Sequence, residues 1–516
     1  MIINKISELK NFDLEAASVR AYRRIDTSTR NVFFAGVGLN ILAWFIFYVH
    51  HPLHNHILRM PWIDWNEQSY LGRWFNNVVL RIIHAADMPT LLPLLSSILA
   101  VAAALVALRI WRLDLTAIER FLIVGMISVF PFFLSFYYYT WITPLFMFSC
   151  LFAVGALAVN TRLQPTPILL GALLFMLMMA SYQTAISIYA TVAASAINCD
   201  LIRKDGPTLL QIAKLAAARI IAAILGGAGY LASLKLLNVG STHATTMVEL
   251  STLPSKFIDV SKAAVRHLTL TQPEFLLPLK FLLLTIVIVG AASTLWLARR
   301  SLLRAALILP MWAGLLIATK LMFLISDDSS FYQYRYNSSM AFFYAFAAAV
   351  ALHAGAFRPY RSFIFVCVVF IVLRFVEVDL IRQEVLLRGQ QHDLAIANRI
   401  LYRIESLPDF DPSKTYDLVR VGKYSRFRQD TLGSKGRNAE TYGDGHMDHG
   451  EITDRWSDEQ IMILLGSKIK FRNRGFDPNF LKKMDDFRKK YAGEKQKWPH
   501  QDSVFIEEDV IYVYME

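Results

Sequence analysis

Long apolar runs separated by short polar segments fill the first three quarters of the chain. A helix needs roughly 20 apolar residues to cross the hydrocarbon core of a bilayer. Runs approaching that length occur at 32–50, 90–110, 121–136, 142–159, 166–180, 184–201, 215–237, 278–297, 305–324, 340–356 and 362–377. The pattern therefore predicts a mainly α-helical, polytopic transmembrane bundle with about 11 spans.

Two of the predicted hairpins, 121–159 and 166–201, have arms that are short for a full span. Their apices, "SFYYYTW" and "SYQTA", are aromatic or polar. A turn at membrane depth is tolerated where protein buries it, and it then forms the floor of a cavity. Tilted helices in a thinned bilayer are the alternative explanation.

Composition and charge agree with a membrane protein and set its orientation. Of the 516 residues, 55% are hydrophobic and 18% are charged. The net charge of +12 comes from residues scattered over loops and the tail, without a nucleic-acid-binding motif, so no nucleic acid is expected as a partner. Alternate short loops carry the basic residues Arg112, Arg120, Arg162, Arg203, Lys204, Arg299, Arg300, Arg358 and Arg361. The positive-inside rule predicts that these loops are cytoplasmic.

This orientation divides the chain into three parts. Residues 1–30 form a cytoplasmic N-terminal segment, and residues 31–378 form the transmembrane domain with a first outer loop at 51–88. An odd number of spans places the tail, 379–516, on the outer side, which is the periplasm in a Gram-negative bacterium. The sequence of the tail predicts a small α+β domain. Its expected elements are a helix in "DLIRQEVLLRGQQHDLAIANRILYRIESL", a strand in "TYDLVRVG", helices in "SDEQIMILLGSKI" and "FLKKMDDFRKKYAG", and a strand pair in "DSVFIEEDVIYVYM".

The first outer loop contains acidic residues at the membrane edge, in "PWIDWNEQSYLGRW". Asp64 lies between two tryptophans, which favour the interface, and Glu67 follows it. A carboxylate at headgroup height can accept the proton of a hydroxyl that attacks a lipid-linked sugar. Both residues can equally belong to a solvated loop or cap the helix predicted next, whose apolar residues between Phe75 and Ile83 share one face.

A lipid phosphate needs positive charge, and three basic residues are candidates for binding it: Lys320, Arg335 and Arg73. Lys320 can instead extend toward the headgroups. We expect substrate contacts from Trp65, from the apex residues Tyr182 and Gln183, and from Asp327, Asp328 and Tyr334 of the loop 325–339. No metal-binding spacing is present. A divalent cation such as Mg²⁺ or Mn²⁺ stays open, because Asp64, Glu67, Asp327 and Asp328 supply hard oxygen ligands.

Several stretches together resemble the serotype-converting O-antigen glucosyltransferase family. They are "IDWNEQSYLGRW", "SYQTAISIYA", "YRYNSSMAFFYA", "ANRILYRIESL", "YDLVRVG" and "WPHQDSVFIEEDVIYVYME". The resemblance implies a fold similar to the glycosyltransferase C superfamily and a multi-pass location in the bacterial inner membrane. It also implies transfer of glucose from an undecaprenyl-phosphate donor to a surface polysaccharide in the periplasm, with an acidic residue of the first loop as the base. That role falls on Asp64 or Glu67.

Two other classes of function remain open on the sequence alone. Many spans with charged residues also describe a transporter or a flippase for lipid-linked sugars, whose sites lie near the bilayer midplane, often between symmetric halves. The conspicuous charges here cluster toward one face and no internal repeat is visible, which favours an enzyme. An envelope scaffold would not need so many spans.

Overall fold

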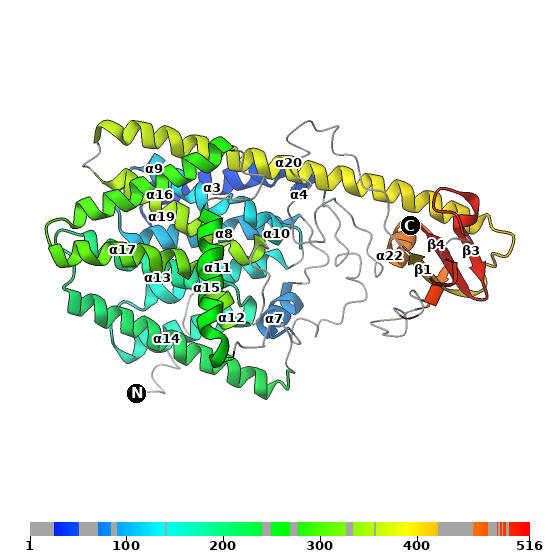
Figure 1. The fold of residues 1–516 in the computed structure, drawn as a ribbon, viewed down its shortest axis with the longest axis horizontal. Coiled ribbons are helices and arrows are strands. Elements are labelled where there is room, and N and C mark those ends of the chain that lie inside the picture. Colours follow the sequence, from blue (N-terminus) through cyan, green and yellow to red (C-terminus); the bar gives the residue numbers. More distant parts are fainter. Residues whose placement is uncertain are drawn as a thin grey trace, which may run out of the picture.

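The computed structural model describes residues 25–50, 71–83, 90–139, 142–239, 249–268, 277–326, 334–354, 358–421, 458–472, 482, 486–487, 489–491 and 495–515. A helical bundle and a small sheet lie at opposite ends of the molecule, joined by one long helix (Figure 1). The helices are α3 (Thr27–Ala43), α4 (Phe45–Val49), α7 (Trp74–Ile83), α8 (Leu91–Trp111), α9 (Ala117–Ser128), α10 (Leu134–Tyr137), α11 (Thr143–Val159), α12 (Pro165–Ser181), α13 (Ala185–Ile202), α14 (Leu209–Leu236), α15 (Leu253–Leu268), α16 (Leu277–Ala298), α17 (Leu302–Ala318), α18 (Leu321–Ile325), α19 (Ser339–His353) and α20 (Arg358–Glu405).

The mainly helical, membrane-spanning class is confirmed. Within the described residues, five helical segments are long and apolar enough to cross a membrane: Leu91–Trp111, Ala117–Tyr137, Ala185–Ile202, Leu209–Leu236 and Leu277–Ala298. Thr143–Val159, Pro165–Ser181 and Leu302–Ala318 are apolar but shorter. Each predicted run falls on helix, yet the span count of about 11 stays a prediction.

Three of the predicted runs are broken helices rather than continuous ones. The first breaks at Trp44, between α3 and α4. The third breaks before Pro131, which begins a 3₁₀ turn (Pro131–Phe133), because proline has no N–H for the helical ladder. The ninth breaks at Lys320, so the run 305–324 is divided between the two helices α17 and α18. Tyr138 and Tyr182, in the two short hairpin apices, are buried in protein.

Helix α19 is the centre of the bundle, because every residue from Ser339 to Leu352 is buried. Its alanines let neighbouring helices approach closely. A Cβ built on Gly290 of α16 would lie only 2.7 Å from the carbonyl oxygen of Ala347. Small residues at such contacts are how helices pack where lipid removes the hydrophobic driving force.

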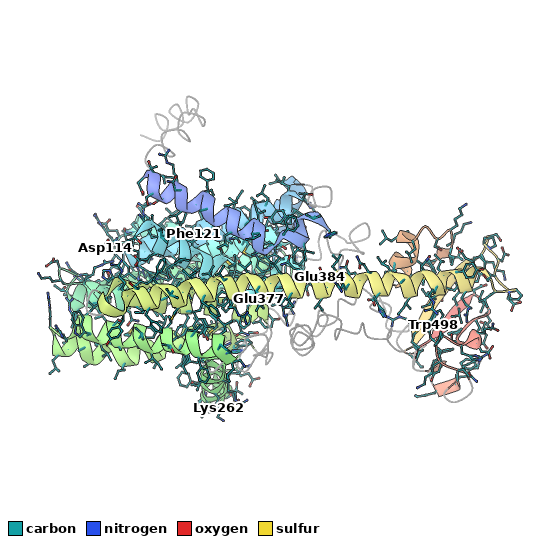
Figure 2. The ribbon with its side chains drawn as sticks, turned by 90° about the horizontal axis from the view of Figure 1, so that it is seen from above. Asp114, Phe121, Lys262, Glu377, Glu384 and Trp498 are labelled. Carbon is teal, nitrogen blue, oxygen red and sulfur yellow. The ribbon has the colours of Figure 1, made fainter. Side chains whose placement is uncertain are left out.

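The two ends of the bundle differ in chemistry. At the end from which α20 leaves toward the sheet, here called the sheet end, Gln383 of α20 donates to the carbonyl of Ala43. At the opposite end, here called the basic end, Arg361 makes two hydrogen bonds of 2.8 and 2.7 Å to the buried carboxylate of Glu119. Figure 2 shows Asp114 near this basic end and Trp498 in the distant sheet domain.

The sheet domain packs on the far end of α20. Its four strands are β1 (Thr415–Val421), β2 (Lys470–Phe471), β3 (Val504–Glu507) and β4 (Val510–Tyr514), in the order β2-β1-β4-β3. Strand β1 runs parallel to both neighbours, and β3 and β4 form an antiparallel hairpin. Helix α22 (Asp458–Leu464) and one face of α20 complete the core through Ile396, Ala397, Ile400, Leu401, Ile404, Ile461 and Met462.

Strands β1, β3 and β4 and helix α22 match the elements expected in the tail, whereas β2 was not expected. The segment "FLKKMDDFRKKYAG" lies mostly outside the described residues. A carboxylate network holds the hairpin to that segment. Glu507 accepts hydrogen bonds from Lys490, at 2.6 Å, and from Tyr491. The hydrogen bond from Lys490 is the main reason that the pKa of Glu507 lies below its usual value.

Candidate functional site

Helix α7 lies within the predicted first loop, 51–88, and is fixed to the sheet end of the bundle. Gly72 has φ +76°, a left-handed conformation that glycine adopts easily, and it turns the chain into the helix. The Trp74 indole donates to Ser233 of α14 at 2.9 Å, and the Asn76 amide donates to the carbonyl of Ser181 at 2.9 Å. Arg73 is thereby held directly over the apex of the second hairpin.

The exposed face of α7 carries two aliphatic side chains and one basic side chain. Val78, Arg81 and Ile82 are exposed, whereas Asn76 and Asn77 are buried. A helix that buries its amides and exposes its aliphatic side chains is suited to lie against lipid, as the sequence predicts for this segment.

Two arginines far apart in the sequence share one aromatic site. The Arg73 guanidinium lies 4.8 Å from the ring centre of Tyr182. Arg335 donates to the Tyr139 hydroxyl at 3.1 Å and lies 5.1 Å from the ring centre of Tyr336. Burial lowers the pKa of Arg73, and the nearby charge of Arg335 lowers it further. Such a pair of cations in a partly desolvated, aromatic setting suits an anion that bears more than one negative charge. We call Arg73, Arg335, Tyr139, Tyr182 and Tyr336 the arginine cluster.

An apolar cavity of about 610 Å³ lies between α13, α14 and α18, and it ends beside the arginine cluster. Its walls are mainly aliphatic, and Gln183 and Tyr230 line its end nearest the cluster. The Gln183 amide donates to the Tyr230 hydroxyl at 2.9 Å and to the carbonyl of Leu71, two residues before Arg73, at 3.1 Å. The cavity and the cluster are therefore joined through these hydrogen bonds.

Lys320 lies at the break between α17 and α18 and has partners inside the protein. Its side chain is fully buried, and its ammonium contacts His267 of α15 and Asn337. These contacts anchor α15, which crosses the bundle, whereas α16 and α17 run along it (Figures 1 and 2). The geometry favours a structural role for Lys320, and its role as a phosphate ligand stays a prediction.

The other candidates from the sequence divide into two groups. Tyr182 and Gln183 lie together at the junction of cavity and cluster. The acidic candidates Asp64, Glu67, Asp327 and Asp328, together with Trp65, lie outside the described residues, and so does the side chain of Tyr334. Their roles stay predictions.

Sequence reasoning did not single out His267, Tyr139, Tyr230 or Tyr336. The helix that carries His267, α15, lies between the predicted apolar runs 215–237 and 278–297, where the sequence analysis expects no span. Its buried positions Val260, Ala263, Ala264 and His267 follow the spacing of an amphipathic helix, which was the available signal. Tyr139 belongs to the aromatic apex, but its pairing with Arg335 depends on the tertiary fold.

Within the part of the chain that the structure describes, no group of three His, Cys, Asp or Glu side chains is placed to hold a metal ion. All four oxygen ligands proposed from the sequence lie in undescribed segments. The divalent cation that the sequence leaves open therefore stays a prediction.

Comparison with known families decides the class of this membrane protein. The family model "Glucosyl transferase GtrII" matches residues 45–352, which is more than half of the chain. The chain belongs to the glucosyl transferase GtrII family. No curated protein matches the sequence, and no solved structure matches the fold.

Membership of the GtrII family confirms the resemblance noted from the sequence. It identifies the protein as a membrane-embedded glycosyltransferase, with a sugar donor and an acceptor as its substrates. The family match begins in α4 and ends in α19, so it includes both Arg73 and Arg335 and the whole apolar cavity. The transporter alternative has no comparable support.

Proposed function

We propose that this protein transfers a glucosyl group from a polyprenyl-phosphate sugar to a surface polysaccharide of the O-antigen type, on the periplasmic side of the bacterial inner membrane. The observation that carries the proposal is the apolar cavity that ends at the arginine cluster. A polyprenyl-phosphate sugar has the same sequence of parts: an isoprenoid chain, an anionic phosphate and a polar sugar.

The isoprenoid chain occupies the cavity between α13 and α14, which is open enough for an alkyl chain to enter from the lipid. The phosphate binds Arg73 and Arg335, whose charges offset its negative charge both before and after the bond to the sugar breaks. The rings of Tyr182 and Tyr336 provide flat surfaces beside the phosphate for the sugar.

The reaction is a single inverting displacement. The acceptor hydroxyl oxygen forms a bond to the anomeric carbon, the bond from that carbon to the phosphate oxygen breaks, and the polyprenyl phosphate departs with the bonding electron pair. Asp64 or Glu67 accepts the hydroxyl proton. No acid is needed for the leaving group, because the phosphate departs as an anion stabilised by the arginines. The acceptor approaches from the side of the sheet domain.

The phosphate site is tested by Arg73→Gln and Arg335→Gln, with Arg388→Gln as the matched control on the exposed side of α20. A charge-assisted contact to phosphate contributes about 2 kcal/mol, so each cluster variant should lose about thirty-fold in kcat/KM for the lipid-linked donor. The control should keep full activity. Unchanged kcat/KM in both cluster variants would show that the donor phosphate does not bind at this site.

The base is tested by Asp64→Asn and Glu67→Gln. We expect the variant of the true base to fold normally, as judged by its melting temperature, and to lose at least about a hundred-fold in kcat. The variant of the other residue should keep most of its activity. If both variants turn over donor at the normal rate in a detergent assay, neither residue is the base.

A further inference from the structure

A second cavity lies at the basic end of the bundle, far from the arginine cluster. It measures about 680 Å³ and is formed where α8, α13, α16 and α19 end and α17 begins. Its lining includes the basic residues Arg112, Arg203, Lys204, Arg299, Arg300 and Arg304, with His353 and the acidic residues Asp114 and Asp205. Most of these residues come from three loops that are far apart in the sequence, whereas Arg304 belongs to α17 and His353 to α19.

Two of the arginines build the walls of the cavity. Arg304 donates to the carbonyls of Arg203, at 3.2 Å, and Pro207, at 2.9 Å, and so joins α17 to the turn after α13. Arg203 donates to the carbonyl of Trp111 at 3.0 Å and pairs with Asp200. The turn is closely packed, because a Cβ on Gly206 would lie 2.8 Å from the carbonyl oxygen of Asp200. The cavity therefore has fixed walls.

The remaining four basic side chains, Arg112, Lys204, Arg299 and Arg300, are exposed. Among the described residues, none of these four side chains has a hydrogen-bonded acid, and Arg299 lies only over the ring of Trp296, at 4.1 Å. With six basic residues against two carboxylates, the lining carries a surplus of four positive charges.

One side of this cavity is apolar. Leu201, Ile202, Leu297 and Ala298 line it at the ends of α13 and α16, two of the helices that are long enough to cross the membrane. A site that joins cations to apolar side chains at the end of membrane-spanning helices has the character of a binding site for an amphiphilic anion.

We propose that this cavity, named here the basic-end cavity, binds the phosphodiester head group of an anionic phospholipid. The phosphate lies among Arg112, Lys204 and Arg300, and the acyl chains lie along the ends of α13 and α16. Binding there holds the loops after α8, α13 and α16 together and stabilises the bundle at the end opposite the arginine cluster. The proposal does not depend on the proposed donor or acceptor.

The test uses the full-length protein, delipidated in detergent, and native mass spectrometry with added phosphatidylglycerol or phosphatidylcholine. The variant is Lys204→Gln with Arg300→Gln. The matched control is Arg109→Gln with Arg162→Gln, two exposed arginines near the same end that do not line the cavity. Each basic side chain beside an anionic lipid contributes about five-fold in affinity, so the variant should bind phosphatidylglycerol about twenty-five-fold more weakly than the control.

Phosphatidylglycerol should also raise the melting temperature of the wild type and the control, but not that of the variant. Unchanged melting temperatures without lipid show that the variants fold. Equal binding of phosphatidylglycerol and phosphatidylcholine, or equal binding by variant and control, overturns the proposal. Inorganic phosphate is added in a parallel arm, and protection by phosphate equal to that by phosphatidylglycerol overturns the assignment to a lipid.

Discussion

Gly227→Phe in α14 tests whether the apolar cavity holds the isoprenoid chain of the donor. Gly227 lines the cavity about one helical turn before Tyr230, close to the arginine cluster. A Cβ at this position would meet no atom within 4 Å. The new ring therefore enters the space proposed for the first isoprene units without displacing the protein.

The size of the effect follows from contact energies. The chain leaves lipid, not water, when it enters the cavity, so the hydrophobic effect contributes little. What the ring removes is packing: five carbon atoms of one isoprene unit, each with about four neighbours, make about 20 contacts of 0.1–0.2 kcal/mol. The loss is about 2 kcal/mol or more, which corresponds to at least a thirty-fold rise in KM for a long-chain donor.

The assay measures initial rates with a long-chain polyprenyl-phosphate glucose and with a donor whose chain is a simple methyl group. Only the long-chain donor should lose affinity, and kcat should change little at saturation. Gly314→Phe, on the exposed side of α17 and also without an atom within 4 Å, is the control and should behave as wild type. An unchanged KM for the long-chain donor in Gly227→Phe would refute the assignment of the cavity.

Three further predictions concern stability, measured as melting temperature or denaturation free energy in detergent. Arg361→Gln removes the two charged hydrogen bonds that the buried Glu119 carboxylate accepts from Arg361, leaves those from Thr116, and should cost about 2 kcal/mol. Arg388→Gln breaks an exposed pair and should cost less than about 0.5 kcal/mol, and equal losses would contradict this. Gly290→Ala forces α16 away from α19 and should cost about 1–3 kcal/mol, and a neutral result would show that the two helices can separate freely. The pKa of Glu507 is lowered in the folded state, so its contribution to stability is present at neutral pH and is lost as pH falls below about 4. Glu507→Gln should therefore be less stable than wild type at pH 7 and equally stable in acid. A difference in stability that persists in acid would contradict the argument.

Much of the fold was predictable because hydropathy is a local signal. Each apolar run became helix, and the strands β1, β3 and β4 lie where alternating residues in the tail indicated. The breaks at Trp44 and Lys320 were not predictable, since no proline or glycine marks them and the flanking residues are as apolar as those in a continuous span. Helix α15 was missed because its mixed polar composition hides an amphipathic spacing.

The candidate site was predictable in its residue types but not in its pairings. The need for cations beside a phosphate selected Arg73, Arg335 and Lys320 from the sequence. Hydropathy cannot tell which of the three share a site. Arg73 is separated from the other two by about 240 positions or more, and only the tertiary fold decides which of them it meets. The structure brings the two arginines together around tyrosines and surrounds Lys320 with His267 and Asn337.

Helix α20 has one further consequence. Its 48 residues form a rod about 72 Å long that begins at the basic end and ends in the core of the sheet domain. Because each residue of a helix adds a fixed rise and a fixed rotation, the length of α20 sets both the distance and the orientation of the sheet domain relative to the bundle. Removing one residue from its stretch between bundle and sheet would turn the sheet by about 100° and draw it about 1.5 Å nearer, whereas removing seven would restore almost the same facing about 10 Å closer. The number of residues in this single helix therefore determines how far the sheet domain lies from the bundle and which way it faces.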